Sequence, residues 1–206
     1  PVVTSMVPLP GGGEARFKTA QIPLPNFRID LAQPLDADGV MDVFLRKYGD
    51  GIQHIGLTVP DRLEVRAAGL VKAGGRVTLG SPSGTFAFVD MTESLGTTLE
   101  LTVAPSSPSP SRLAPAAAPG ALGASMVNHV GLILKDVRRT AALFAELTGA
   151  AAPQIIVAKG IDFPPSFRGD RTHEVQISMA KIGNISLELQ QDPGTGKGPN
   201  PWNDSA

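Results

Sequence analysis

Hydrophobic and polar residues alternate along several short stretches of the chain, which is the pattern of half-buried β-strands. Three such stretches lie at residues 2–7, 15–24 and 27–31, separated by breaks that contain Pro or Gly. Apolar residues at helical spacing follow at 36–48, and Gly49 supplies a helix stop. The pattern therefore predicts three strands and then one helix in the first quarter of the chain.

A second set of elements follows directly and has the order βαβββ. The alternation predicts strands at 52–59, 76–79, 85–91 and 97–103, a helix at 62–74, and turns at 81–84 and 93–96. In the first of these strands, alternation places His54 and Gly56 on one face. Ile55 and Leu57 lie on the other face, and we expect the imidazole of His54 to point where Gly56 leaves room.

The same order of elements returns in the last third of the chain. Strands are predicted at 127–134, 154–158, 174–181 and 184–190, with a helix at 137–147 and a loop containing Pro and Arg at 160–171. Small strands and helices repeated in this order predict an α+β fold.

Residues 104–125 consist mainly of Pro, Ala and Ser, a composition with little to bury and typical of a linker. The predicted organisation is a partial βββ module with a connecting helix at 1–48, a βαβββ module at 49–103, the linker at 104–125, a second βαβββ module at 126–192 and a tail at 193–206.

Composition narrows the class of protein. The net charge of −1 over 206 residues gives no basic surface, so no nucleic-acid partner is expected. The absence of Cys excludes disulfides, zinc–thiolate sites and cysteine nucleophiles. No apolar run approaches the roughly 20 residues that span a bilayer, and no signal-peptide pattern is present, so we expect a soluble cytoplasmic protein without a membrane partner. The opening at Pro1 without Met fits either Met removal or truncation, and the content of the first segment favours truncation.

Candidate chemistry lies in two repeated phrases. His54 lies within Gly51-Ile-Gln-His-Ile-Gly-Leu-Thr-Val59, and His129 lies in the matching place of Val127-Asn-His-Val-Gly-Leu-Ile-Leu-Lys135. Each module ends with a carboxylate in an apolar frame, Glu100 in Thr98-Leu-Glu-Leu101 and Glu188 in Ser186-Leu-Glu-Leu189. A carboxylate in such a frame is costly unless it is paired or bound to metal. A lone His is more often structural, but two imidazoles and two carboxylates in repeated places suit a divalent metal.

A repeated βαβββ unit with His on its first strand and Glu on its last resembles the vicinal oxygen chelate superfamily. This superfamily includes glyoxalase I, methylmalonyl-CoA epimerase, extradiol dioxygenases and bleomycin-resistance proteins. The local match is best to the epimerase and glyoxalase I group, through Arg28-Ile-Asp-Leu-Ala-Gln-Pro34, a short helix at 40–48, and Gly49-Asp-Gly-Ile-Gln-His-Ile55.

The resemblance implies a cupped mixed sheet, glyoxalase-like, to which each module supplies two metal ligands. These ligands are His54, Glu100, His129 and Glu188, and the ion is Ni, Co, Mn, Zn or Fe. The resemblance implies a metal-dependent lyase or isomerase that abstracts a proton α to a carbonyl or thioester through a metal-stabilised enediolate. Glu100 or Glu188 is the implied base, the partner is a small-molecule substrate, and a homodimer with exchange of strands or modules is expected.

Residues 1–35 depart from the family pattern. They resemble the second half of a module that lacks its His-bearing strand and helix, with Asp30 at the carboxylate position. The chain is then either a trimmed tandem protein or a permuted arrangement, and Asp30 can replace Glu188 opposite His54 and Glu100. Gln53 also stands where many epimerases have a second His.

Two other functions fit the same pattern. One is a non-catalytic protein that sequesters an antibiotic or another small molecule without metal. The other is an Fe(II) extradiol-type dioxygenase, for which Tyr48 and His173 are the remaining candidates to line the site. Arg168 and Arg171 in the predicted loop could meet a substrate carboxylate or phosphate, although a solvated loop is the simpler interpretation.

Overall fold

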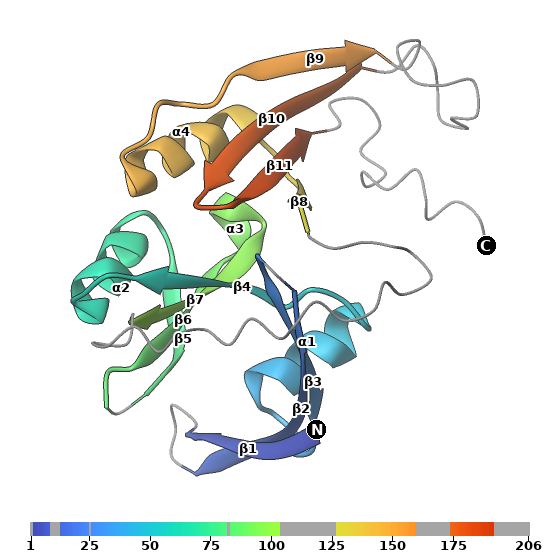
Figure 1. Ribbon diagram of the computed structural model, residues 1–206, viewed down its shortest axis with the longest axis vertical. Coiled ribbons are helices and arrows are strands. Elements are labelled where there is room, and N and C mark those ends of the chain that lie inside the picture. The colour runs from blue at the N-terminus through green and yellow to red at the C-terminus, as the bar shows by residue number, and fades with distance from the viewer. Residues whose placement is uncertain are drawn as a thin grey trace. The chain divides into compact units, whose positions relative to one another are not determined.

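The computed structural model describes residues 2–8, 13–24, 26–81, 83–103, 127–159 and 174–191 (Figure 1). The chain divides into two compact units, an N-terminal unit of residues 1–93 and 97–127 and a C-terminal unit of residues 94–96 and 128–206. The predicted linker at 104–125, loop at 160–171 and tail at 193–206 lie outside the described residues. The predicted module boundaries stay predictions.

The N-terminal unit begins with an antiparallel sheet in the order β1-β2-β3. Its strands are β1 (Val2–Pro8), β2 (Glu14–Pro23) and β3 (Arg28–Pro34). At the turn between β2 and β3, the amide of Leu24 donates to the carbonyl of Phe27 at 2.7 Å, and the amide of Phe27 donates back at 3.4 Å. Three strands without an intervening helix are what the alternation predicts.

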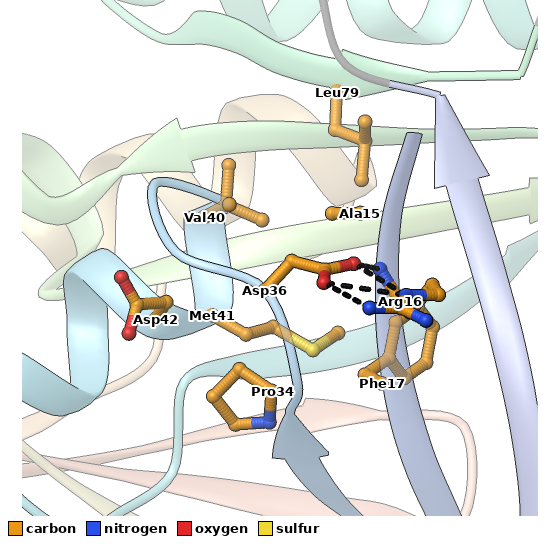
Figure 2. A pocket seen from close by; sticks show the side chains of 10 residues that line it. Ala15, Arg16, Phe17, Pro34, Asp36, Val40, Met41, Asp42 and Leu79 are labelled. Atoms are coloured by element: carbon orange, nitrogen blue, oxygen red, sulfur yellow. Dashed lines mark hydrogen bonds and ion pairs between the residues drawn. The ribbon is translucent and has the colours of Figure 1, made fainter. Parts of the chain in front are cut away.

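Helix α1 (Val40–Tyr48) follows, and Gly49 ends it with a φ of 73°, as the sequence predicts. It begins four residues later than expected because Asp36 is bound elsewhere. The Asp36 carboxylate accepts hydrogen bonds from the backbone amide and the guanidinium of Arg16, each at 2.7 Å (Figure 2). These bonds lower the pKa of Asp36 to about 2 and fasten the connection between β3 and α1 onto β2. The expected apolar face of α1 is not buried, and Val43 is exposed.

The middle module has the predicted βαβββ order. It consists of β4 (His54–Val59), α2 (Leu63–Lys72), β5 (Arg76–Gly80), β6 (Phe86–Met91), the short helix α3 (Thr92–Leu95) and β7 (Thr97–Val103). The strand order is β4-β7-β6-β5, with β4 parallel to β7. One expectation is wrong, because α3 stands where the turn at 93–96 is predicted. Val71 has helical spacing with the buried residues Leu63, Ala67 and Leu70 of α2 but is itself exposed.

The last module has the same topology in the C-terminal unit. It consists of β8 (His129–Ile133), α4 (Val137–Thr148), β9 (Ile155–Lys159), β10 (Glu174–Ile182) and β11 (Ile185–Gln191), in the strand order β8-β11-β10-β9. Asp136 caps α4 by accepting a hydrogen bond from the Arg139 amide at 2.9 Å, and Gly149 ends it. Val137, Ala141 and Phe144 are the buried apolar face of α4.

Two modules with one topology make the fold an α+β fold of glyoxalase-like βαβββ modules, as predicted. In each module, apolar residues of the helix and the last strand are buried, and in the middle module β6 adds Val89 and Met91 to the core. None of the helices in the described ranges is long and apolar enough to cross a membrane.

Candidate metal-binding pairs

The parallel strands β4 and β7 bring His54 and Glu100 together. Their register places Gly56 opposite Glu100, and His54 lies two residues before Gly56 on the same face of the strand. Gly56 leaves room for the carboxylate, because a Cβ at this position would lie 3.5 Å from Glu100 Oε2. The Nε2 atom of His54 lies 3.4 Å from Glu100 Oε2. The two side chains are thus neighbours in this module, and their role as metal ligands stays a prediction.

The apolar frame around Glu100 explains its orientation. Leu99 and Leu101 are buried, and β7 packs against α2. Because side chains alternate along a strand, burying these two leucines turns Glu100 to the opposite face. The face that carries the His54–Glu100 pair is therefore set by the core of the module.

The last module repeats this arrangement. The register of β8 and β11 places Gly131 opposite Glu188, and His129 Nε2 lies 3.4 Å from Glu188 Oε2. Leu187 and Leu189 are almost fully buried on either side of Glu188. The two modules thus present the same pair at the same distance.

Both imidazoles are held by an amide from the preceding residue. His54 Nδ1 lies 2.6 Å from Gln53 Oε1, and His129 Nδ1 lies 2.6 Å from Asn128 Oδ1. In the tautomer that donates from Nδ1 to the amide oxygen, the neutral ring leaves its Nε2 lone pair facing the carboxylate. Metal-binding His residues commonly donate their second ring nitrogen to an oxygen in this way.

The amide contacts give Gln53 and Asn128 a role that sequence reasoning missed. Gln53 was noted only as a departure from the epimerase pattern, in which a second His is common. The signal was present, since a residue with a side-chain amide directly precedes the His in both phrases.

The geometry of each pair fits two ligands of one divalent ion. Two donors held at about 2.1 Å from a tetrahedral ion lie roughly 3.4 Å apart. Imidazole nitrogen with carboxylate oxygen suits Zn and neighbouring transition metals. Within the described residues, however, no group of three or more His, Cys, Asp or Glu could hold a metal ion. Each pair alone is therefore less than a full ligand set, and metal binding by the four residues stays a prediction.

The two pairs differ in their surroundings. The ring of Phe88 meets the His54 ring edge-on with centroids 4.8 Å apart, and Phe86 meets Phe88 at 6.0 Å. The register places Phe88 directly opposite Glu100, whereas Met179 stands opposite Glu188 and is 47% exposed. Accordingly, the His54 side chain is 21% exposed and the His129 side chain is 46% exposed.

Other predicted site residues are not gathered at these pairs in the described part of the chain. Asp30 accepts a hydrogen bond from Arg28 Nη2 at 2.8 Å and joins no metal-binding group of three. Tyr48 is exposed on α1, where its ring stacks on Phe44. His173, Arg168 and Arg171 lie outside the described residues.

No protein-family model matches the chain, and no curated protein matches it. Among solved structures, it is similar to a triple mutant of 4-hydroxymandelate synthase from Streptomyces coelicolor, with 18% identity and a TM-score of 0.58 over 95% of this chain and 57% of the synthase. A glyoxalase family protein from Enterococcus faecalis shows 13% identity over 68% of this chain and 96% of its own, with a TM-score of 0.33.

The likeness to the synthase concerns the fold. The chain spans 57% of the length of that enzyme and follows its backbone over this part. The resemblance noted in the sequence is thus confirmed for the fold, while the assignment to the epimerase and glyoxalase I group stays a prediction. The chain has the glyoxalase-like fold of βαβββ modules that it shares with part of 4-hydroxymandelate synthase.

Proposed function

We propose that the chain is a metal-dependent enzyme of the lyase or isomerase type, which moves a proton at the carbon next to a carbonyl or thioester. One observation carries the proposal. Each module holds a His Nε2 at 3.4 Å from a Glu oxygen, while the Nδ1 of the same ring contacts an amide oxygen. In the neutral tautomer that donates from Nδ1, such an imidazole offers a bare Nε2 beside a carboxylate, and a cation between them would relieve the repulsion.

The proposed ligands are His54 and Glu100 in the middle module and His129 and Glu188 in the last. A divalent ion held by these residues would act as a Lewis acid toward an oxygen of the substrate. Ni, Co, Mn, Zn and Fe all accept this combination of nitrogen and oxygen donors.

Glu100 is the proposed base in the middle module. Its carboxylate is partly exposed and lies on the face opposite the core, so a small substrate can reach it. Phe88 beside it excludes water from one side of the pair, which favours proton transfer between carbon and carboxylate. His54, oriented by Gln53, would hold the ion beside this carboxylate. Glu188 is the corresponding base in the last module.

Metal analysis of the purified chain tests the first half of the proposal. We expect Zn²⁺, Ni²⁺, Co²⁺ or Mn²⁺ to bind, and the ratio separates two arrangements. One ion per chain supports a single set of four ligands, whereas two ions support independent sites. Absence of binding for all of these ions would contradict the proposal.

Deuterium incorporation tests the second half. The metal-loaded chain is incubated in D₂O with a panel of α-branched acyl thioesters and 2-hydroxy ketones, and uptake at the α-carbon is followed by mass spectrometry. We expect Glu100→Gln or Glu188→Gln to abolish uptake. Glu174→Gln is the matched control, because Glu174 is an exposed carboxylate paired with Lys159. Equal uptake in all variants would exclude both carboxylates as the base.

A second candidate function is metal-free binding of an aromatic small molecule. The edge-on series of Phe86, Phe88 and His54 favours it, because such rings can pack against an aromatic ligand. Saturable binding by the metal-free chain, lost in Phe86→Ala, would support this function. Oxygen uptake by the Fe(II)-loaded chain with a catechol would instead support a dioxygenase. A homodimer also stays a proposal, which sedimentation would test.

A further inference from the structure

The first sheet lacks a strand that both other sheets contain. Each sheet has a strand that comes last in the sequence, namely β3, β7 or β11. Each of these strands pairs antiparallel with the strand that precedes it in the sequence. On their other side, β7 pairs with β4 and β11 pairs with β8, both in parallel. Among the described strands, none pairs with the second side of β3. The sheet is therefore open at the place where its two counterparts are closed.

The carboxylates show that the three strands correspond residue by residue. Asp30 stands opposite Gln21 on β2, as Glu100 stands opposite Phe88 and Glu188 opposite Met179.

The backbone hydrogen-bonding groups of β3 alternate in the way that pairing with one more strand requires. Leu24 and Phe27 exchange hydrogen bonds, so alternation along the ladder turns the polar groups of Ile29 and Leu31 toward β2. The amides of Arg28, Asp30 and Ala32 then point to the open side. β11 has the same alternation, and its partner strand is present. The Ser186 amide donates at 3.2 Å to the carbonyl of Asn128, the residue before β8.

One face of the open sheet carries exposed apolar side chains, next to the polar residues Thr4, Lys18 and Gln33. Leu31 follows Asp30 as Leu101 follows Glu100 and Leu189 follows Glu188. Leu101 and Leu189 are buried, yet Leu31 is 53% exposed. The same face of the sheet carries three further exposed apolar residues, namely Val2, Met6 and Ile22.

The intact modules indicate what covers this face. In the middle module, α2 connects β4 to β5 and packs on β6 and β7. In the last module, α4 packs on β10 and β11. A strand and the helix after it therefore close the edge and the face together.

We propose that β3 binds a strand–helix segment of polypeptide from outside residues 1–206. Its strand runs parallel to β3, and its helix lays an apolar stripe over Leu31. A second copy joined symmetrically through β3 would pair antiparallel and would leave Leu31 and its apolar neighbours exposed. A strand–helix segment accounts for both the open edge of β3 and these exposed residues. The proposal goes beyond the metal chemistry and does not depend on it.

A duplication within the chain tests the proposal. A copy of residues 52–75, which contains β4 and α2, is placed directly before residue 1. The copied strand and helix then come directly before β1, in the same order in which β4 and α2 come before β5. Hydrogen exchange of the β3 amides is followed by NMR in the chain and in the fusion.

In the chain alone, we expect the Arg28, Asp30 and Ala32 amides to exchange fast. In the fusion, these three amides should exchange at least about tenfold more slowly, because each becomes hydrogen-bonded to the added strand or shielded from water by the added helix. The Ile29 and Leu31 amides, bonded to β2, should exchange slowly in both proteins. They show that the sheet is folded in each protein.

Ala32→Pro in the fusion is the matched variant. It removes an outward donor without removing a bond to β2, so the gain in protection should disappear while Ile29 and Leu31 stay slow. Three results would overturn the proposal. The fusion could show no slowing at Asp30, Ala32→Pro could leave the slowing intact, or the amides could already be protected in the chain alone, as a monomer or a dimer.

Discussion

The two His–Glu pairs have the same geometry in different surroundings. Both hold Nε2 and Oε2 at 3.4 Å, yet His54 lies under Phe88 whereas His129 is about twice as exposed, at 46% against 21%. The distance follows from the parallel register of the first and last strands, which the two modules share. Exposure follows from the neighbouring strand, which carries Phe88 in one module and Met179 in the other. The distance within each His–Glu pair and the exposure of its His to water are therefore set by different residues.

This separation has an electrostatic consequence. A charge–charge interaction strengthens as water is excluded, so an ion beside His54 should be held more firmly than one beside His129.

The largest expected effect comes from breaking the frame that both pairs share. Leu101 and Leu189 each follow the Glu of their pair and are buried. Leu101→Ala and Leu189→Ala should each lower the free energy of unfolding by about 2–5 kcal/mol, through lost burial and the cavity left behind. Urea unfolding measures the loss. A loss below about 1 kcal/mol would mean that the frame does not hold the strand.

Much of this frame can be predicted from the sequence. Alternation around Glu100 and Glu188 gives the strands and their buried faces, and Gly49 and Gly149 give the helix ends. These signals are local, so they need no knowledge of the partner strand.

Other features depend on neighbours distant in sequence. Val43 and Val71 have helical spacing but are exposed, because no other element covers them sufficiently. The enclosure of His54 depends on Phe88, which lies on β6 and becomes a neighbour only through the sheet. The bond from Asp36 to Arg16 joins residues 20 positions apart. Such contacts are set by packing, which the sequence pattern does not encode locally.

The next largest effect is the loss of a ligand. His54→Ala should weaken Zn²⁺ binding by at least about 100-fold, or about 2.7 kcal/mol. His129→Ala should weaken binding less, because its pair is more exposed to water. Calorimetric titration measures both, and Lys159→Ala on β9 is a control that should bind as the parent chain does. An equal loss in the two His variants would remove the distinction between the pairs.

Loss of the orienting amides should have a smaller effect. Gln53→Leu and Asn128→Leu leave Nδ1 without its acceptor, so the rings lose their fixed tautomer and orientation. Zn²⁺ binding should weaken by about 10–100-fold in each case. Gln53→Glu should retain most of the affinity, since a carboxylate also accepts from Nδ1. Unchanged affinity in the leucine variants would show that the amides do not orient the rings.

The smallest effect concerns a group remote in sequence from both pairs. The bonds from Arg16 lower the pKa of Asp36 to about 2, below the value of about 3.9 for an unperturbed Asp. The ionised Asp36 therefore stabilises the fold above pH 4, and this contribution is lost as the pH falls from about 4 to 2. Asp36→Asn should remove that part of the pH dependence of unfolding and leave Zn²⁺ binding unchanged. A pH dependence equal to that of the parent chain would contradict the assignment.

The Nε2 atoms of His54 and His129 are the proposed ligands of a divalent ion. The ¹⁵N NMR signals of the imidazoles during titration with Zn²⁺ test this proposal most directly, because the chain contains only three His residues. The account predicts that the Nε2 signals of His54 and His129 shift on binding while their Nδ1 atoms stay protonated. Signals of both residues that stay in place through a full equivalent of Zn²⁺ per pair would contradict it.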